Sequence, residues 1–269
     1  MKINWFSPLP PANSDIINYT IKLLPFLQEK VEITLWTNQS RWDIKLKTEV
    51  AVKEYKIEQI SWLELNQGDV NIYHIGNNAE LYGDIWQISR RFPGIVILHD
   101  EKLQDFFYML SSSKNEYIEY MKQCYAEEGN KNARLFLNNY HSREFMAENY
   151  PLTPLALENA LGVITYNRNS YLTLSAQNHT FVGYMPSLAN SINTDNNINS
   201  NLLSDVDALL NFASQACKYR CQSSLDRIVN RIVPELTYLN PKIETLNNFE
   251  NLIDAIEFIT LPVDSNSQR

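Results

Sequence analysis

Residues 70–99 read VNIYHIGNNAELYGDIWQISRRFPGIVILH. The stretch opens on a strand-like run, Val70–Ile75, and closes on a second one, Gly94–His99. Residues 79–91 between them carry a helix-period pattern, and Pro93-Gly94 stops it before the second run. Strand, helix and strand in this order are typical of a parallel sheet covered by helices. The stretch therefore predicts an α/β fold.

The same alternation continues on both sides of this unit. Residues 16–27 carry apolar side chains at three- and four-residue steps, which predicts a crossover helix preceded by candidate caps at residues 13–15. Residues 101–148 are helical in pattern without a strand signal, so we expect a cluster of helices inserted between two strands. Further strands are expected at Lys2–Phe6, Val31–Trp36, Gly162–Tyr166 and Phe181–Met185, with a weaker candidate at Tyr55–Ile60.

The predicted fold class is a Rossmann-like, doubly wound, mostly parallel sheet with inserted helices and a C-terminal helical tail. Residues 1–188 form the predicted domain, and the Ser- and Asn-rich residues 189–201 a linker. Residues 202–262 are expected to form three helices that pack on the domain. Their apolar stripes are Leu203, Val206, Leu210, Ala213 and Cys217, then residues 225–232, then residues 252–259, with Pro234 bending or ending the middle helix.

The net charge, the cysteines and the apolar runs of the sequence exclude several classes of function. The 269 residues carry a net charge of -8 without a segregated basic stripe, so nucleic acid is not an expected partner. The three cysteines, Cys124, Cys217 and Cys221, match neither a disulfide framework nor a zinc site. The N-terminus lacks the pattern of a signal peptide, and no apolar run is long enough for a membrane span, which predicts a bacterial cytoplasmic protein.

Three loops that follow predicted strands hold the candidate functional residues, because ligands of an open parallel sheet bind beyond the carboxyl ends of its strands. Ser7–Asp15 is a proline-rich loop expected to offer free backbone N–H groups to an anion or a sugar hydroxyl; the alternative is a rigid turn with an ordinary cap. His74–Asn78 contains a glycine and two amides that suit a polyhydroxylated ligand, or form a common turn. His99-Asp100 is a candidate for positioning or deprotonating a hydroxyl, although His99 is equally consistent with a structural role.

Other chemistries are not indicated. The sequence has no Gly-x-Gly-x-x-Gly fingerprint, no P-loop and no Gly-x-Ser-x-Gly elbow. His141 and His179 lack the partner one helical turn away that a helical metal site needs. We therefore expect no metal and no cofactor, with a nucleotide sugar as the conceivable co-substrate.

Four segments, taken in order, resemble a known family. They are WFSPLPPANSDIINYT (residues 5–20), YHIGNNAELYGDIWQISRRFPGIVILHDEKLQDFF (73–107), ALGVITYNRNSYLTL (160–174) and FVGYMPSLA (181–189). Together they resemble the acceptor-side, N-terminal domain of bacterial GT-B glycosyltransferases of the large family 4 type. The resemblance covers about residues 1–190.

The resemblance implies that these loops face a cleft for the acceptor and part of the donor. It makes His99 and Asp100 the candidate catalytic residues. The implied substrate-binding residues are Ser7, Pro11, Asn13, Ser14, Asp15, His74, Gly76, Asn77, Asn78 and Tyr82. Three positions depart from the family pattern: Asp15 stands where a glycine is usual, Tyr82 where many relatives have histidine, and Tyr166-Asn167 where His-Ser is common. Each change removes a group useful for sugar transfer.

Nothing after Pro186 resembles the donor-binding Rossmann domain of such enzymes, while Tyr219–Leu239 resembles their helical C-terminal end. The resulting hypothesis is a partial or degenerate glycosyltransferase that keeps an acceptor-side cleft and is inactive in sugar transfer on its own. One alternative is an active, hexosyltransferase-like subunit whose donor domain is a separate chain. Another is a non-catalytic interaction or scaffold protein. The expected partners are a sugar or glycan acceptor and either a donor-domain protein or a second copy of the chain.

Overall fold

The computed structural model describes residues 1–12, 14–177, 181–185 and 202–218. These residues form an all-parallel sheet of seven strands in the order β3-β2-β1-β4-β5-β6-β7. The α/β prediction is thus confirmed. The strands are β1 (Lys2–Phe6), β2 (Glu32–Thr37), β3 (Ala51–Glu54), β4 (Val70–Ile75), β5 (Ile95–Leu98), β6 (Gly162–Thr165) and β7 (Val182–Tyr184).

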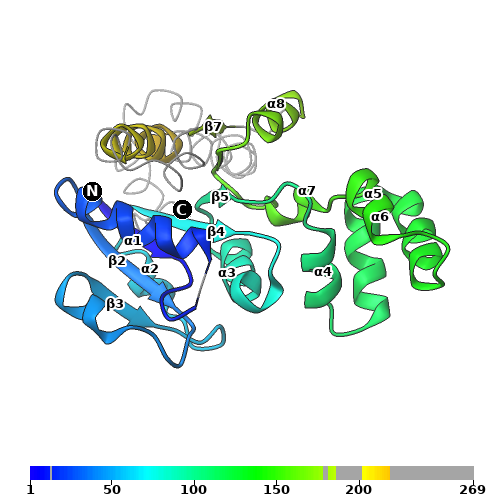
Figure 1. Cartoon of the computed structure of the whole chain (residues 1–269), viewed down its shortest axis with the longest axis horizontal. Coiled ribbons are helices and arrows are strands. Elements are labelled where there is room, and N and C mark those ends of the chain that lie inside the picture. The colour runs from blue at the N-terminus through cyan, green and yellow to red at the C-terminus, as the bar shows by residue number, and fades with distance from the viewer. Residues whose placement is uncertain (13, 178–180, 186–201, 219–269) are drawn as a thin grey trace, which may run out of the picture. The chain divides into compact units, whose positions relative to one another are not determined.

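Helices connect the strands and cover both faces of the sheet (Figure 1). They are α1 (Asp15–Gln28), the 3₁₀ helix η1 (Ile44–Thr48), α2 (Trp62–Leu65), α3 (Ala79–Arg91), α4 (Gln104–Leu110), α5 (Lys114–Leu137), α6 (Arg143–Asn149), α7 (Thr153–Ala156) and α8 (Arg168–Ala176). A further helix spans residues 202–218. The chain divides into two compact units, Met1–Cys217 and Lys218–Arg269, and all elements above belong to the first except the last residue of that helix.

The third strand lies at a different position from the predicted one. The weak candidate Tyr55–Ile60 is not a strand, and β3 lies four residues earlier. As an edge strand it pairs only with β2, and its ladder ends where β2 ends, at Thr37 opposite Glu54. The Tyr55 N–H donates one more hydrogen bond to the Thr37 carbonyl, and its ring then turns into the core. Burial of Tyr55, and not strand pairing, explains the apolar signal.

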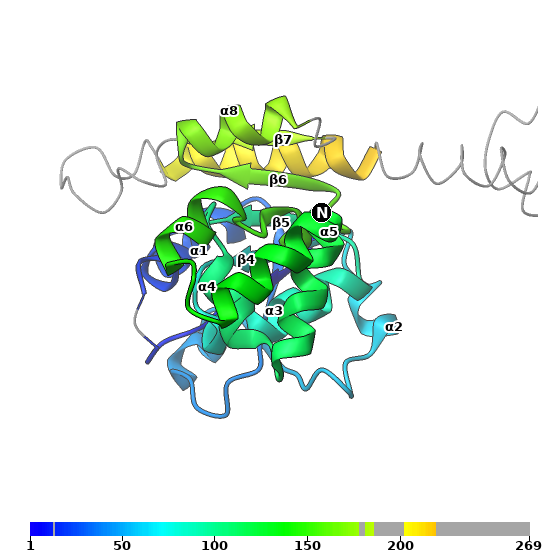
Figure 2. The same cartoon turned by 90° about the vertical axis from the view of Figure 1, so that its right-hand side faces the viewer.

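Side chains alternate between the two faces of the sheet, as the pleat requires. Trp5, Ile72 and Ile97 point to one face, which α1 and the helix of residues 202–218 cover. Phe6, Tyr73 and Val96 point to the other, where α3 and the inserted helices pack. In Figure 2 the helix of residues 202–218, drawn in yellow, runs along β7, where the Phe212 ring lies against Gly183. A sheet buried on both faces explains why the strands read as nearly continuous apolar runs.

The buried face of the helix of residues 202–218 lies next to the face that the sequence predicts. Val206 and Ala213 are buried as expected, but Leu203 is 40% exposed. The buried stripe is Leu202, Val206, Leu209, Ala213 and Ala216. Packing of Phe212 sets this rotation, because its ring lies against Gly162 of β6 and Gly183 of β7, where a Cβ atom would meet it at 2.9 Å. The predicted linker and the two later helices lie outside the described residues.

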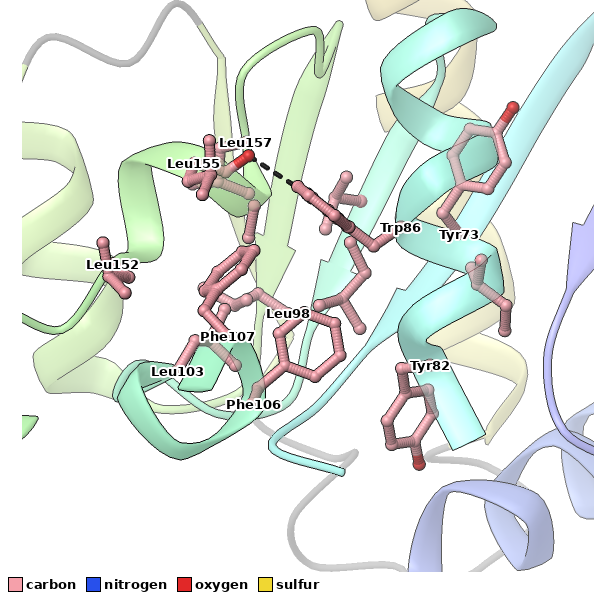
Figure 3. Close-up of a cluster of buried hydrophobic side chains, with 14 of the residues drawn as sticks. Tyr73, Tyr82, Trp86, Leu98, Leu103, Phe106, Phe107, Leu152, Leu155 and Leu157 are labelled. Carbon is pink, nitrogen blue, oxygen red and sulfur yellow. Dashed lines mark hydrogen bonds between the residues drawn. The ribbon is translucent and has the colours of Figure 1, made fainter. Parts of the chain in front are cut away.

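The inserted helices form the second part of the core, and the prediction of helices without strands over residues 101–148 is confirmed. Trp86 of α3 lies at the centre of this packing, with Phe106 and Phe107 of α4 against its ring (Figure 3). Its indole N–H donates to the Leu155 carbonyl at 3.2 Å. This contact ties the long insertion to the sheet domain. No helix in the described part of the chain is long and apolar enough to cross a bilayer.

Candidate functional site

The site lies at the switch point of the sheet. From β1 the chain builds β2 and β3 on one side and β4 to β7 on the other. The helix after β1 covers one face and the helix after β4 covers the opposite face, so the two loops diverge at the carboxyl ends of these strands. Crevices of this kind bind the ligands of open α/β sheets. We call the six candidate residues that meet there the edge cluster: His74, Gly76, Asn77, Tyr82, His99 and Asp100.

Two histidines form the centre of the edge cluster. His74 Nδ1 and His99 Nε2 are 2.8 Å apart, and the rings stack with centroids 5.1 Å apart. His74 is fully buried and His99 half-buried. The strand register explains the contact: Ile97 of β5 lies beside His74 of β4, and His99, two residues on, projects to the same face.

Both histidines are neutral at pH 7. Burial lowers the pKa of His74 to about 3. Burial, and secondly the neighbouring His74, lowers the pKa of His99 well below its usual value. A neutral pair needs one N–H donor and one acceptor across the 2.8 Å contact. The pair therefore carries no positive charge for a phosphate group.

The surroundings of His74 indicate which ring donates. Among the described residues, His74 Nε2 is buried without a hydrogen-bond partner. A proton on Nε2 would bury an unpaired N–H, which is rarer in proteins than an under-used acceptor. The favoured tautomer therefore has the proton on Nδ1, which donates to His99 Nε2. His99 then carries its own proton on Nδ1 and presents a neutral N–H donor outside the pair.

Neighbouring groups hold His99 in place. The Tyr166 hydroxyl donates to the His99 carbonyl at 2.8 Å, and the two rings pack with centroids 5.4 Å apart. The His99 N–H donates to the Ile75 carbonyl at 2.9 Å. Tyr166 thus fixes the backbone of a candidate catalytic residue.

Asp100 joins the loops after β4 and β5. Its carboxylate accepts a hydrogen bond from the Asn77 N–H at 2.7 Å. Gly76 makes the close approach possible: a Cβ atom there would lie 3.0 Å from Tyr82 Cε2 and 3.2 Å from Asp100 Oδ2. Asp100 and His99 therefore engage different partners, because adjacent residues of an extended segment point to opposite sides.

Tyr82 closes the cluster from α3. It is 2% exposed, and its hydroxyl lies close to Ser14 and Asp100 without a hydrogen bond of normal geometry among the described residues. Burial, supported by the charge of Asp100, raises the pKa of Tyr82 to about 12. The hydroxyl is therefore protonated at pH 7.

The proline-rich loop is a poorer source of free N–H groups than expected. Prolines have no N–H, the Leu9 N–H donates to Gln39 Oε1 at 2.6 Å, and the Ala12 N–H donates to the Leu9 carbonyl. The expectation of free donors is therefore wrong over residues 8–12. Ser7 is also buried, and its hydroxyl donates to the Pro8 carbonyl at 3.0 Å.

The remaining predicted site residues have local roles or fall outside the description. Ser14 is the N-cap of α1 and accepts from the Ile17 N–H, while Pro11 is exposed. Asn78 caps α3 because its side chain accepts from the Glu80 and Leu81 N–H groups. The side-chain Oδ1 of Asn77 accepts from the Phe106 N–H at 2.9 Å. Asp15 begins α1, its side chain lies outside the description, and Asn13 is not among the described residues.

The histidine pair predicts an acid-sensitive fold. Since the folded pKa of His74 lies below that of the unfolded chain, the stability linked to it is complete above pH 6.5 and is lost as the pH falls toward 3. We expect the unfolding free energy of the wild type to fall by about 2 kcal/mol more than that of H74F between pH 8 and pH 5. Urea titrations of both proteins at the two pH values measure this difference. Parallel pH dependences would contradict the assignment.

Comparisons with known proteins leave the family open. No protein-family model matches the sequence, and no curated protein is significantly similar to it. Within the described ranges, no group of three or more His, Cys, Asp or Glu side chains is arranged to hold a metal ion. The candidate chemistry therefore rests on the edge cluster.

Sequence reasoning named both histidines but not their contact, and it missed the contribution of Trp5. The Trp5 ring packs against His74 with centroids 4.8 Å apart and helps to bury it. The order of β4 and β5 and their register would have placed the two histidines on one face. In the same way, the period-2 alternation of β1 would have placed Trp5 on the face that carries His74.

Proposed function

We propose that this chain is a glycosyltransferase-related protein that binds a sugar or glycan acceptor at the edge cluster and does not transfer sugar on its own. The observation that carries the proposal is the neutral His74–His99 pair at the switch point of the sheet. It supplies a fixed donor where open α/β sheets bind their ligands. The four-segment resemblance to the acceptor-side domain of GT-B enzymes supports the choice of ligand class.

The groups around the pair suit hydroxyl ligands. His99 Nδ1 and the Tyr82 hydroxyl are donors, and the Asp100 carboxylate, which already accepts from Asn77, offers further acceptor sites. Sugar hydroxyls donate and accept at once, so they complement such a mixture. His99 is only half-buried as a residue, while its partner His74 lies in the core.

The charge of the cluster supports the inactivity. At pH 7 none of the six residues is cationic, since both histidines are neutral, and Asp100 adds a negative charge. Transfer from a nucleotide sugar needs positive groups or helix termini at its phosphates. A neutral acceptor fits the edge cluster better than a diphosphate donor.

The test separates binding from turnover. The full-length chain is expected to release no nucleoside diphosphate from UDP-glucose or GDP-mannose, and to bind neutral acceptor glycans in a ligand-observed NMR screen. The variant H99A should weaken that binding at least tenfold, by about 1.4 kcal/mol, because the fixed donor is lost. The control H141A changes a histidine outside the cluster and should bind as the wild type does.

Two outcomes would overturn the proposal. Turnover by the isolated chain would contradict its inactivity, and equal glycan binding by H99A and the wild type would contradict the assigned site. A parallel nucleotide-sugar assay on proteins that co-purify from the native organism tests the alternative. Activity that appears only in such a complex would identify a subunit that works with a separate donor-domain chain.

A further inference from the structure

A second concave site lies outside the edge cluster. A cavity of about 450 Å³ opens beyond the carboxyl ends of β2 and β3, between the loop after β2 and the segment that leads into α2. Its volume is within the range of small-molecule sites. β2 is three strand positions from β5, so the cavity is roughly 14 Å along the sheet edge from His99. We call it the β2–β3 cavity.

Aromatic residues give this cavity a rigid wall. Trp36 and Tyr55 both line it, and they are 2% and 6% exposed. Both pack on Phe6 of β1: the Trp36 ring stacks on it with centroids 5.5 Å apart, and the Tyr55 ring meets it edge-on at 5.6 Å. Lys53 Nζ lies 5.1 Å from the centre of the Trp36 ring. A wall fixed in this way loses little conformational entropy when a ligand binds.

The Tyr55 hydroxyl is an unmet hydrogen-bonding group in this wall. It is buried and has no hydrogen-bond partner among the described residues. A buried hydroxyl without a partner destabilises the folded protein, because it has lost its hydrogen bonds to water. Burial first, and the charge of Asp84 second, raise the pKa of Tyr55, so the hydroxyl stays protonated. A ligand hydroxyl that met it would remove the penalty.

Two carboxylates supply the acceptors. Glu54 accepts from the Trp42 indole N–H at 2.9 Å, and Glu64 lies 3.4 Å from Lys53 Nζ. These contacts orient the side chains, and each carboxylate has lone pairs for further donors. With Lys56, the charged lining sums to one negative charge. This balance disfavours phosphates and favours neutral ligands that present several hydroxyl groups.

We propose that the β2–β3 cavity binds a neutral saccharide or polyol through Glu54, Glu64 and Tyr55, separately from the edge cluster. The inference does not depend on the proposed function, because it rests on the lining of this cavity alone. It gives the protein two hydroxyl-binding positions along one edge of the sheet.

Saturation-transfer NMR on the full-length protein tests the site with glucose, galactose, mannose and myo-inositol at millimolar concentrations. We expect saturation of at least one of them and at least fivefold weaker binding by Y55F, which keeps the ring but removes the hydroxyl. E64Q should also weaken binding, because an amide accepts fewer hydrogen bonds than a carboxylate. Because the edge cluster is proposed to bind neutral ligands too, Y55F is also made in the H99A background, where only the β2–β3 cavity remains. H141A, which changes a histidine outside both sites, is the matched control and should leave this binding unchanged.

Each result decides between the two sites. At least fivefold weaker binding by Y55F/H99A than by H99A supports the β2–β3 cavity, whatever the fate of the edge cluster. No saturation by any of the four probes, or equal binding by Y55F/H99A and H99A, would overturn the inference. Tighter binding of glucose 6-phosphate than of glucose would overturn the charge argument. Thermal unfolding of Y55F confirms that the variant is folded.

Discussion

Substitution of Trp86 by alanine is expected to lower the free energy of unfolding by about 3–5 kcal/mol, the usual cost of removing a buried tryptophan. The side chain is 1% exposed, and Phe107 meets its ring edge-on at 5.0 Å. The substitution also leaves the Leu155 carbonyl without its indole donor. Because this contact links α3 of the sheet domain to the insertion, the loss should affect both parts. Urea unfolding followed by circular dichroism measures it.

Leu172 provides the control for this experiment. Its side chain is 55% exposed on α8, so L172A should change the unfolding free energy by less than about 0.5 kcal/mol. The phenylalanine variant W86F keeps part of the ring packing and should fall between the two. A loss below about 1 kcal/mol in W86A would show that the insertion does not depend on this contact.

Substitution of Gly129 by alanine should be nearly as damaging, at about 3 kcal/mol. Helix α5 is sharply kinked at Tyr125 and Ala126, where Ala126 has φ 50° and ψ -136°. The kink brings Gly129 against the preceding arm, and a Cβ atom there would lie 2.1 Å from the Met121 carbonyl oxygen. The added methyl group meets backbone, which cannot move without opening the kink. Thermal and urea unfolding of G129A measure the cost.

A second substitution in the kink, A126G, is the matched variant for G129A. Ala126 adopts a backbone conformation that favours glycine, so A126G relieves strain and should raise the unfolding free energy by about 1 kcal/mol. The two substitutions exchange the same two residue types three positions apart and are expected to act in opposite directions. The reverse pattern, with G129A stabilising and A126G destabilising, would mean that helix propensity, and not the kink, controls the stability of α5.

The two candidate sites share an edge but differ in electrostatic character. The edge cluster is built on a neutral histidine pair with one carboxylate, Asp100. The β2–β3 cavity combines buried aromatic walls with the carboxylates of Glu54 and Glu64. Neither contains the concentration of positive charge that phosphates require. Both therefore point to uncharged ligands with several hydroxyl groups, in line with the acidic net charge of -8.

Much of the fold was predictable from local patterns. The first and fourth strands and α3 have the bounds expected from apolar runs and from the Pro93-Gly94 stop. Ser14 caps α1 as its position before the apolar stripe indicates. These features depend on residues close together in sequence, so local sequence patterns are sufficient to predict them.

Other features depended on partners distant in sequence. β3 begins at Ala51 because Thr34 of β2 offers it a ladder, and residues 55–60 find no such partner strand. The helix of residues 202–218 turns Leu203 outward because Gly162 and Gly183 accept the Phe212 ring. Two apolar stripes one residue apart satisfy the same helical period, and only contact with the sheet selects one.

The candidate site also combines features that the sequence predicts with features that only the tertiary structure determines. By itself the sequence determined that His74, Gly76, His99 and Asp100 follow or end buried strands of an α/β sheet, since hydrophobic periodicity places them there. Only the tertiary structure decided that His74 and His99 share a hydrogen bond while Asp100 turns to Asn77. The physical reason is strand order and register: parallel strands adjacent in the sheet bring together residues 25 positions apart, and burial between the layers then makes both imidazoles neutral.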